Sequence, residues 1–344
     1  MPLKTFGKLP KGAAFERVRS SSNFNGQSFN NPIPTQMGVK AHRVMKDYFK
    51  TRSTRKPEKP IPVANKLKND FTETPSTALK LMWLGHASLL IEIEGIRILT
   101  DPVFSNRVSP FSWMEPKRMH DTPFSLNEMP DIDVIVISHN HYDHLDLEFI
   151  NYVKDHNIRF VVPLAVGETL LHWGIDGENI VELDWHESYT YNNVSFTATP
   201  ARHFTGRGLL DRNKALWMST VIKGSEESLF FCGDSGFFEG FEDIGHQYGA
   251  FDFTIIGIGA YNEQWKAIHT NPQEALKAHN LLKGKHFLPI HWCTFDLAPH
   301  PWMEPVEWLM QENQKVKSNV VIPKAGEFIT SAIADQYQQE FWWR

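Results

Sequence analysis

The feature that most constrains this chain is a cluster of metal-ligating side chains directly after an apolar stretch. Residues 134–137 are four β-branched residues typical of a buried strand, and His139-Asn140-His141-Tyr142-Asp143-His144 follows them. A strand that ends in such a loop can direct the first two histidines to one point and the aspartate and last histidine to another. Imidazole and carboxylate groups suit zinc, manganese or iron. The cluster therefore predicts a metal site, because a solvated loop without metal would leave these groups crowded and unpaired.

Further metal-ligating residues come later in the chain, each just beyond a short strand-like segment. They are His203, Asp234 and His291, after the segments 194–199, 229–232 and 286–290. Each alone is a weak signal, since an isolated histidine after a strand is more often a hydrogen-bonded core or surface residue. Their order behind the first cluster favours one shared site with two metals.

This ordered set resembles the ligands of the metallo-β-lactamase superfamily of binuclear metallohydrolases. More narrowly, several motifs resemble N-acyl-phosphatidylethanolamine-hydrolysing phospholipase D and its bacterial relatives. These motifs are Trp83-Leu84-Gly85-His86-Ala87, Leu99-Thr100-Asp101-Pro102-Val103-Phe104, Gly259-Ala260-Tyr261, His269-Thr270-Asn271-Pro272 and Ile290-His291-Trp292. The resemblance runs from about Leu81 to Phe328. It departs in the loop from Phe204 to Arg212, which contains Thr205-Gly206-Arg207-Gly208, and at Cys293, a position where glycine is commoner.

The resemblance implies two Zn²⁺ ions per chain, although manganese and iron suit the same ligands. It implies one ion held by His139, His141 and His203, and a second held by Asp143, His144 and His291. Asp234 would bridge the two, and a bridging hydroxide would be the nucleophile.

Four more roles follow from these motifs. We expect Asp143 to take part in catalysis as well as in metal binding. His269 is expected to contact the substrate phosphate or the leaving group, with simple packing as the alternative. For His86 a supporting role and a catalytic role are both open. Asp101, before Pro102, is expected to fix a turn near the metal loop.

The fold expected from the alternation of strands and helices is a two-sheet sandwich with helices outside, the αββα layering of the superfamily. Strands are predicted at 81–84, 88–93 and 96–100. Helices are predicted at 147–155, 166–172 and 272–282, the last with Asn271 as N-cap, Pro272 at the first position and Glu274 as capping partner. With 344 residues and 41% hydrophobic content, the chain can bury one large core or two modest ones.

The leading function is zinc-dependent hydrolysis of a phosphodiester, with a phospholipid as the expected substrate. The alternative is hydrolysis of a lactone or a carboxylic ester, because the same hydroxide can attack a carbonyl carbon. A third class, a non-enzymatic scaffold with a degenerate site, does not fit the intact set of ligands.

Charge divides the chain into a basic arm and an acidic body. Residues 1–70 carry 15 Lys and Arg against 4 acids, a net charge of +11. Because the whole chain has a net charge of −5, the remaining residues have a net charge of −16. We expect an N-terminal extension over 1–75 and a catalytic domain over 76–344. The extension either attracts anionic lipid headgroups or packs over the core. We do not expect nucleic acid as a partner, because the acidic body repels a phosphate backbone.

Location and membrane contact are predicted from three further observations. The chain has no run of about 18 apolar residues, so we expect no membrane-spanning helix. No apolar segment follows its first lysines, so we expect no secretory signal. Its two cysteines, Cys232 and Cys293, suit a reducing compartment and are expected to be packed thiols. The loop 110–119 combines Phe111, Trp113 and Met114 with two cations, and either dips into a membrane surface or roofs the core. We expect a cytoplasmic protein, or a peripheral one at the inner membrane surface, while the oligomeric state is not indicated.

Overall fold

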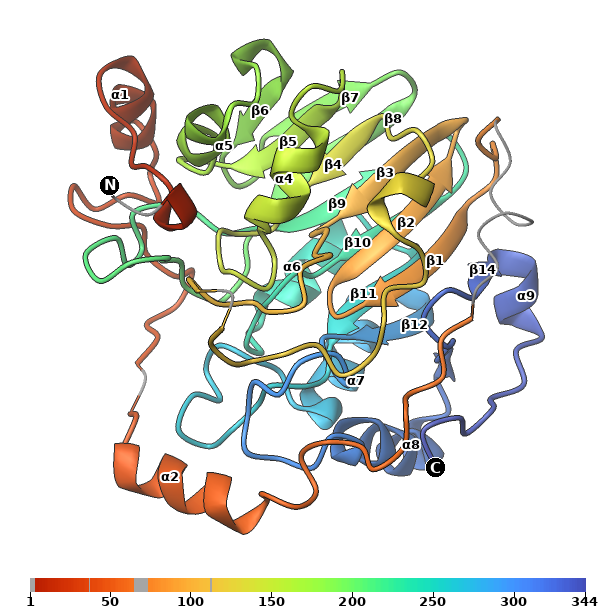
Figure 1. The fold of residues 1–344 in the computed structure, drawn as a ribbon. Coiled ribbons are helices and arrows are strands. Elements are labelled where there is room, and N and C mark those ends of the chain that lie inside the picture. The colour runs from red at the N-terminus through yellow and green to blue at the C-terminus, as the bar shows by residue number, and fades with distance from the viewer. Residues whose placement is uncertain (1–3, 37, 65–73, 112) are drawn as a thin grey trace.

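Two seven-stranded sheets lie face to face, with helices on their outer sides (Figure 1). The computed structural model describes residues 4–36, 38–64, 74–111 and 113–344. The αββα layering expected from the sequence is confirmed. Large side chains from both sheets, including Trp83, Phe160 and Phe230, are fully buried and form one contiguous core.

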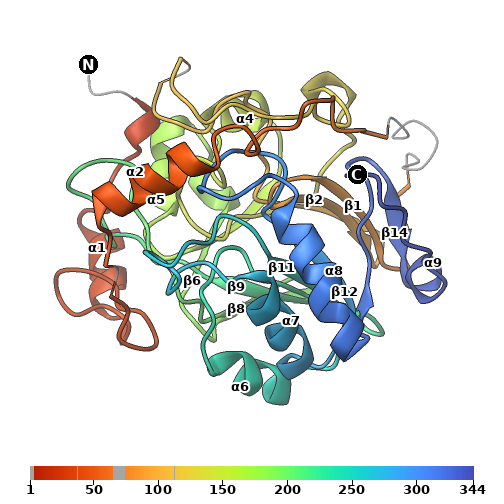
Figure 2. The ribbon, with the colours of Figure 1, turned by 90° about the horizontal axis from the view of Figure 1, so that it is seen from below.

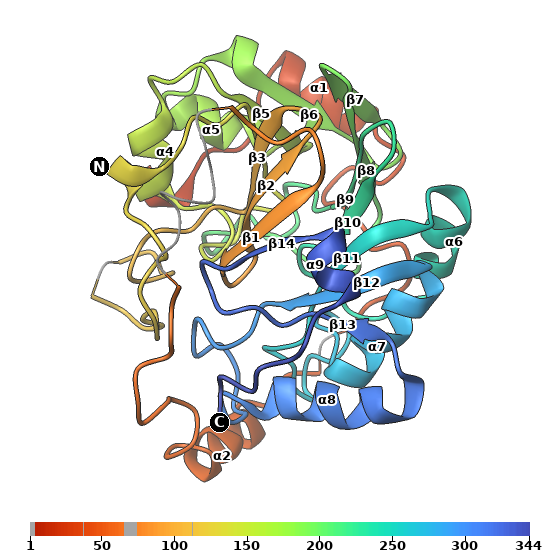
Figure 3. The same cartoon turned by 90° about the vertical axis from the view of Figure 1, so that its right-hand side faces the viewer.

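The first sheet has the strand order β14-β1-β2-β3-β4-β5-β6. Strands β1 to β3 are antiparallel neighbours, whereas β3 to β6 run parallel. The last strand, β14, returns to pair with β1 (Figure 3). The strands are β1 (Lys80–Gly85), β2 (Ser88–Ile93), β3 (Ile96–Thr100), β4 (Val134–Val136), β5 (Arg159–Pro163), β6 (Ile180–Leu183) and β14 (Phe328–Thr330).

The second sheet repeats this pattern in the order β13-β12-β11-β10-β9-β8-β7. Strands β7 to β10 are antiparallel neighbours and β10 to β13 run parallel. The strands are β7 (Ser188–Tyr191), β8 (Val194–Thr199), β9 (Ser219–Lys223), β10 (Ser228–Phe231), β11 (Phe251–Gly257), β12 (Gly284–Ile290) and β13 (Asn319–Val320).

Helices cover the outer faces of the two sheets (Figures 1 and 2). Helix α5 packs beside β6, and α7 packs on β11 and β12. Helix α7 begins as predicted, because Asn271 Oδ1 accepts from the Glu274 amide at 2.9 Å and Glu274 Oε2 accepts from the Asn271 amide at 3.1 Å. The helices of the body are α4 (Leu147–Val153), α5 (Gly167–Trp173), α6 (Gly240–Gln247), α7 (Pro272–Leu281), α8 (Glu304–Val316) and α9 (Ser331–Asp335).

The predicted elements agree with those observed to within two residues at each end. The predicted strands at 81–84, 88–93 and 96–100 are β1, β2 and β3. The predicted helices at 147–155, 166–172 and 272–282 are α4, α5 and α7. Strong periodicity and a complete capping box made these elements readable from the sequence alone.

The N-terminal arm runs along the body and contains α1 (Ala13–Arg19) and α2 (Ala41–Lys50). The Asn31 side chain binds the His203 backbone, donating to its carbonyl and accepting from its amide, both at 2.8 Å. Arg55 pairs with Asp296 at 2.5 Å beyond α2. The described part of the arm therefore contacts the body at these positions. Residues 1–3, 37 and 65–73 of the predicted extension lie outside the described residues.

The loop predicted to meet a membrane or roof the core leaves much of its apolar surface in solvent. The Trp113 ring is exposed and stacks on Phe111 at a centroid distance of 5.5 Å, and Met114 is also exposed. Ser112, within this loop, lies outside the described residues. Across the described part of the chain, each helix is too short or too polar to cross a membrane.

Candidate metal centre

Four loops bring the predicted ligands together where the two sheets meet at one edge. The loop after β4 supplies four of them, His139, His141, Asp143 and His144. The segments after β8, β10 and β12 supply His203, Asp234 and His291. One sheet therefore contributes four ligands and the other three, so the site exists only when both sheets are folded and packed.

Three histidines form the first group. His139 Nε2 lies 2.8 Å from His141 Nδ1, and His203 Nε2 lies 3.3 Å from the same nitrogen. The Nδ1 atom of His203 donates to the Ile268 carbonyl at 2.9 Å, which leaves its Nε2 free to bind a metal. These three nitrogens come from the three residues predicted to hold one ion.

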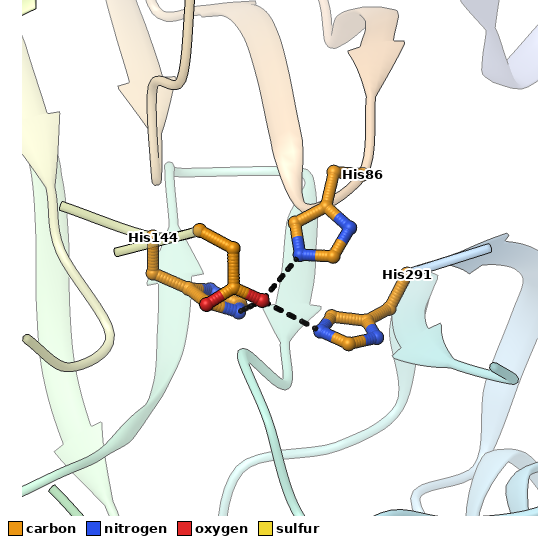
Figure 4. A group of neighbouring side chains, drawn as sticks. His86, His144 and His291 are labelled. Carbon is orange, nitrogen blue, oxygen red and sulfur yellow. Dashed lines mark hydrogen bonds and ion pairs between the residues drawn. The ribbon is translucent and has the colours of Figure 1, made fainter. Parts of the chain in front are cut away.

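In the second group, His86, His144 and His291 point toward one another (Figure 4). Asp143 belongs to the same group. Asp143 Oδ2 lies 2.9 Å from His86 Nε2, 3.5 Å from His144 Nε2 and 3.6 Å from His291 Nε2. Three of these four residues are the predicted ligands of the second ion. His86 joins them from the end of β1, in a position that fits either ligation or support of Asp143.

Asp234 lies between the two groups. Its Oδ2 atom is 3.6 Å from His203 Nε2 and 4.0 Å from His139 Nε2, both in the first group. In the second group, the same oxygen is 3.3 Å from His144 Nε2, and Oδ1 is 3.1 Å from His291 Nε2. One carboxylate thus reaches both groups, which is the arrangement that a bridging ligand requires.

The donor atoms fit divalent metals. Within the part of the chain that the structure describes, His144 Nε2 and both ring nitrogens of His291 are buried without a hydrogen-bond partner. A buried polar atom left without a partner costs free energy, so nitrogens in this position fit the coordination of a cation. The combination of imidazole nitrogens and carboxylate oxygens is typical of zinc and other borderline metals.

Burial and charge set the protonation of the site. Burial lowers the pKa of His139 and His203 well below the ordinary value, and that of His141 to about 4, so these rings are neutral at pH 7, as metal ligation requires. Burial also disfavours protonated His291, but the carboxylates of Asp234 and Asp143 outweigh it and raise the pKa of His291 to about 9. A cation bound among these carboxylates would compete with that proton.

Asp101 orients a ligand, a role that sequence reasoning missed. Its Oδ2 atom accepts from His144 Nδ1 at 2.6 Å and from Ser138 Oγ at 2.5 Å, and Oδ1 accepts from the Ser138 amide at 2.7 Å. The carboxylate therefore fixes the ring that directs His144 Nε2 into the site. The sequence analysis assigned Asp101 to a turn and did not predict its bond to His144. The two residues come together because β3 pairs with β4 in parallel.

Several residues at or near the ligands have a left-handed backbone conformation. The φ angles are 52° at His86, 35° at Asp101, 62° at His291 and 51° at Cys293. Such angles are costly for residues with a Cβ and persist where surrounding contacts determine them. The His291 amide donates to the His86 carbonyl at 3.0 Å, so the loops after β12 and β1 hold each other. The positive φ at Cys293 is a conformation that glycine would adopt without strain.

His269 lies at the open side of the site. Its Nδ1 atom is 3.8 Å from Asp234 Oδ2, and its side chain is 15% exposed. It lines a pocket of 320 Å³ together with ligands of both groups and the apolar side chains of Val39, Phe204 and Leu297. Burial lowers the pKa of His269 to about 4, so its ring is neutral at pH 7. Its position fits either a substrate contact or metal ligation, since His203, Asp234 and His269 form a cluster that could hold an ion.

Comparisons with known proteins find relatives in both sequence and fold. Residues 96–292 match the model of the beta-lactamase superfamily domain. An uncharacterized protein of Mycobacterium tuberculosis is 38% identical, covering 94% of this chain and 88% of that protein. N-acyl-phosphatidylethanolamine-hydrolyzing phospholipase D 1 of Caenorhabditis elegans is 34% identical, covering 89% of this chain and 86% of that protein. A metallo hydrolase of Ignicoccus hospitalis shares the fold, with a TM-score of 0.57 and 19% identity over 73% of this chain and 97% of that one.

Replacement of Asp101 by Asn tests its orienting role. The Asn amide keeps the size of the side chain but weakens the acceptor for His144 Nδ1. We expect metal affinity to fall about 10- to 100-fold while the fold is retained. Competition with a fluorescent zinc chelator measures the affinity, and circular dichroism checks the fold. Asp155→Asn, which removes an equal charge at an exposed position, is the control; equal affinities for the two variants would contradict the role.

Proposed function

This chain belongs to the metallo-β-lactamase superfamily and is a metal-dependent hydrolase, and we propose that it hydrolyses a phosphodiester, that of a phospholipid, with two zinc ions. The observation that carries the proposal is the position of Asp234, whose carboxylate reaches both ligand groups. The similarity over most of both chains to the phospholipase D of Caenorhabditis elegans supports the substrate class.

His139, His141 and His203 would hold one ion, and Asp143, His144 and His291 the other. Asp234 would be shared between them. Bound together, the metals lower the pKa of a water ligand to about 7 and supply positive charge for the phosphoryl oxygens. Manganese or iron would fit the same nitrogen and oxygen donors.

The remaining side chains bind and orient the reactants. Asp143 lines the pocket and is held by His86 Nε2, so its carboxylate can orient the attacking water by accepting a hydrogen bond. The neutral ring of His269 can donate to a phosphoryl oxygen or to the leaving-group oxygen. Val39, Phe204 and Leu297 line the same pocket and provide an apolar wall that excludes water and suits the lipid part of a substrate.

The substrate class is tested with three compounds on zinc-loaded protein. We expect cleavage of a bis-aryl phosphodiester and of N-acyl-phosphatidylethanolamine in detergent micelles, with the headgroup alcohol as a product. A lactone should be a poor substrate, at least tenfold lower in kcat/KM. Chromatography of the products and a spectrophotometric assay give the rates. Efficient lactone cleavage without diester cleavage would replace the proposal by the ester and lactone alternative.

The number of metals is tested by elemental analysis. Seven ligands would be excessive for one ion, so protein purified without chelator and reconstituted with zinc should hold about two equivalents. Asp234→Asn should lower the affinity for both ions, because the Asp234 carboxylate reaches both groups. His203→Ala should lower the affinity chiefly for one ion. A value that stays at one equivalent after reconstitution would contradict a binuclear centre.

Replacement of His269 by Ala tests its contact with substrate. His269→Ala should keep both metals and the melting temperature but lose at least tenfold in kcat/KM, about 1.4 kcal/mol of transition-state stabilisation. His269→Gln, which retains a hydrogen-bond donor, should recover part of the loss. Metal loss in the Ala variant would instead assign His269 to the ligands, and a lowered melting temperature with full activity would assign it to packing.

A further inference from the structure

A loop between β8 and β9 presents two leucines fully to solvent. Leu209 is 100% exposed and Leu210 is 90% exposed. We name residues 206–211 the leucine finger. In Figure 1 this green loop projects from the left side of the molecule, near the N-terminal end. Exposed apolar side chains that occur together, unlike scattered single ones, indicate a surface for interaction.

Hydrogen bonds at its base hold the finger in this position. The carboxylate of Asp211 accepts from the Arg207 amide at 2.8 Å and from the Gly208 amide at 2.9 Å. The buried Arg207 guanidinium donates to the Asn140 and Leu145 carbonyls at 2.9 and 2.8 Å. The base is thus fixed to the loop that carries the metal ligands, and the exposure of the leucines is built into the fold.

Helix α2 presents a second apolar surface. Met45 and Phe49, four residues apart on one face, are 59% and 70% exposed. Tyr48 on the inner side donates to the Leu297 carbonyl at 3.3 Å and fastens the helix to the body. The outer face of α2 therefore carries apolar side chains that nothing in the described structure covers.

Cations surround both apolar surfaces. Lys4, Lys8 and Lys11 are exposed on the segment beside the finger, where Phe6 and Leu9 line the same hollow as the two leucines. Exposed cations also lie on and around α2. These are Lys40, Arg43, Lys46, Lys50, Arg52, Lys56 and Lys59. Apolar side chains among cations are complementary to a bilayer whose headgroups are anionic.

Each of the two surfaces is close in sequence to a residue that lines the catalytic pocket. Phe204 stands two residues before the finger, Val39 stands two residues before α2, and both line the 320 Å³ pocket that holds His269. The finger and α2 also lie on the same side of the molecule in Figures 1 and 2. A flat surface that contacts both would therefore pass close to residues that line the pocket.

We propose that the leucine finger and α2 together dock the protein on an anionic lipid bilayer, with the catalytic pocket turned toward the membrane. This inference rests on the proposed function for the choice of a lipid as the partner. The leucines and Phe49 enter the boundary between headgroups and acyl chains, while the lysines remain at the phosphates. Docking delivers a phospholipid to the pocket without its passage through water.

Sedimentation with vesicles tests the proposal on the full zinc-loaded chain. The vesicles are phosphatidylcholine alone, or phosphatidylcholine with 30% phosphatidylserine as a chosen probe, at about 50 and 500 mM salt. We expect binding to the anionic vesicles that weakens at high salt. Leu209→Ser with Leu210→Ser, and separately Met45→Ser with Phe49→Ser, should each lower the partition coefficient at least tenfold. Val316→Ser with Ile333→Ser, at exposed positions on α8 and α9, is the matched control and should bind as the wild type does.

The outcomes separate docking from catalysis. Both double variants should hydrolyse a water-soluble diester at the wild-type rate, which also shows that they are folded. If diester is cleaved but anionic vesicles are not bound at low salt, or if the finger variant binds like the control, docking is wrong and the proposed function stands. If vesicles are bound through the finger but no diester is cleaved, the proposed function fails and docking stands. Light scattering tests whether two copies associate through the leucines. If they associate, the finger variant does not, and no vesicles are bound, this surface belongs to a dimer instead.

Discussion

The buried carboxylate of Asp234 is the group on which the arrangement of the site depends. Five imidazoles approach it within 4.0 Å, those of His139, His144, His203, His269 and His291. A buried anion is stable only beside positive charge or strong donors, so these rings and the metals that they fit are needed to offset its desolvation. The two sheets must therefore meet with their ligand loops in register, because Asp234 on one sheet faces the loop after β4 on the other.

Left-handed backbones show how tightly this register is held. His86 and His291 both have positive φ, and the hydrogen bond between their backbones closes the gap between the ends of β1 and β12. The Thr294 hydroxyl accepts from the His86 amide at 2.7 Å and adds a second connection. Strain in the backbone is thus maintained by contacts between the two halves of the fold, and it places imidazoles where regular strands could not direct them.

Sequence reasoning reached the ligands but not the contacts that orient them. The ligand set was predictable because each member follows a strand-like segment, and α7 was predictable because Asn271, Pro272 and Glu274 mark its start. The bond from His144 to Asp101 was not, since it joins residues 43 positions apart through the pairing of β3 with β4. The path of the arm over the body could not be predicted either, because turn-rich and charged segments have no periodicity that indicates which residues they contact.

The order of the ligands along the chain has a consequence for protein synthesis. The loop after β4 emerges from the ribosome first, the ligands of the second sheet follow one by one, and His291 is the last. Strand β14, which completes the first sheet beside β1, comes later still. A nascent chain therefore exposes four metal-binding side chains well before their partners exist. The full set of ligands is therefore complete only after the chain through His291 has emerged.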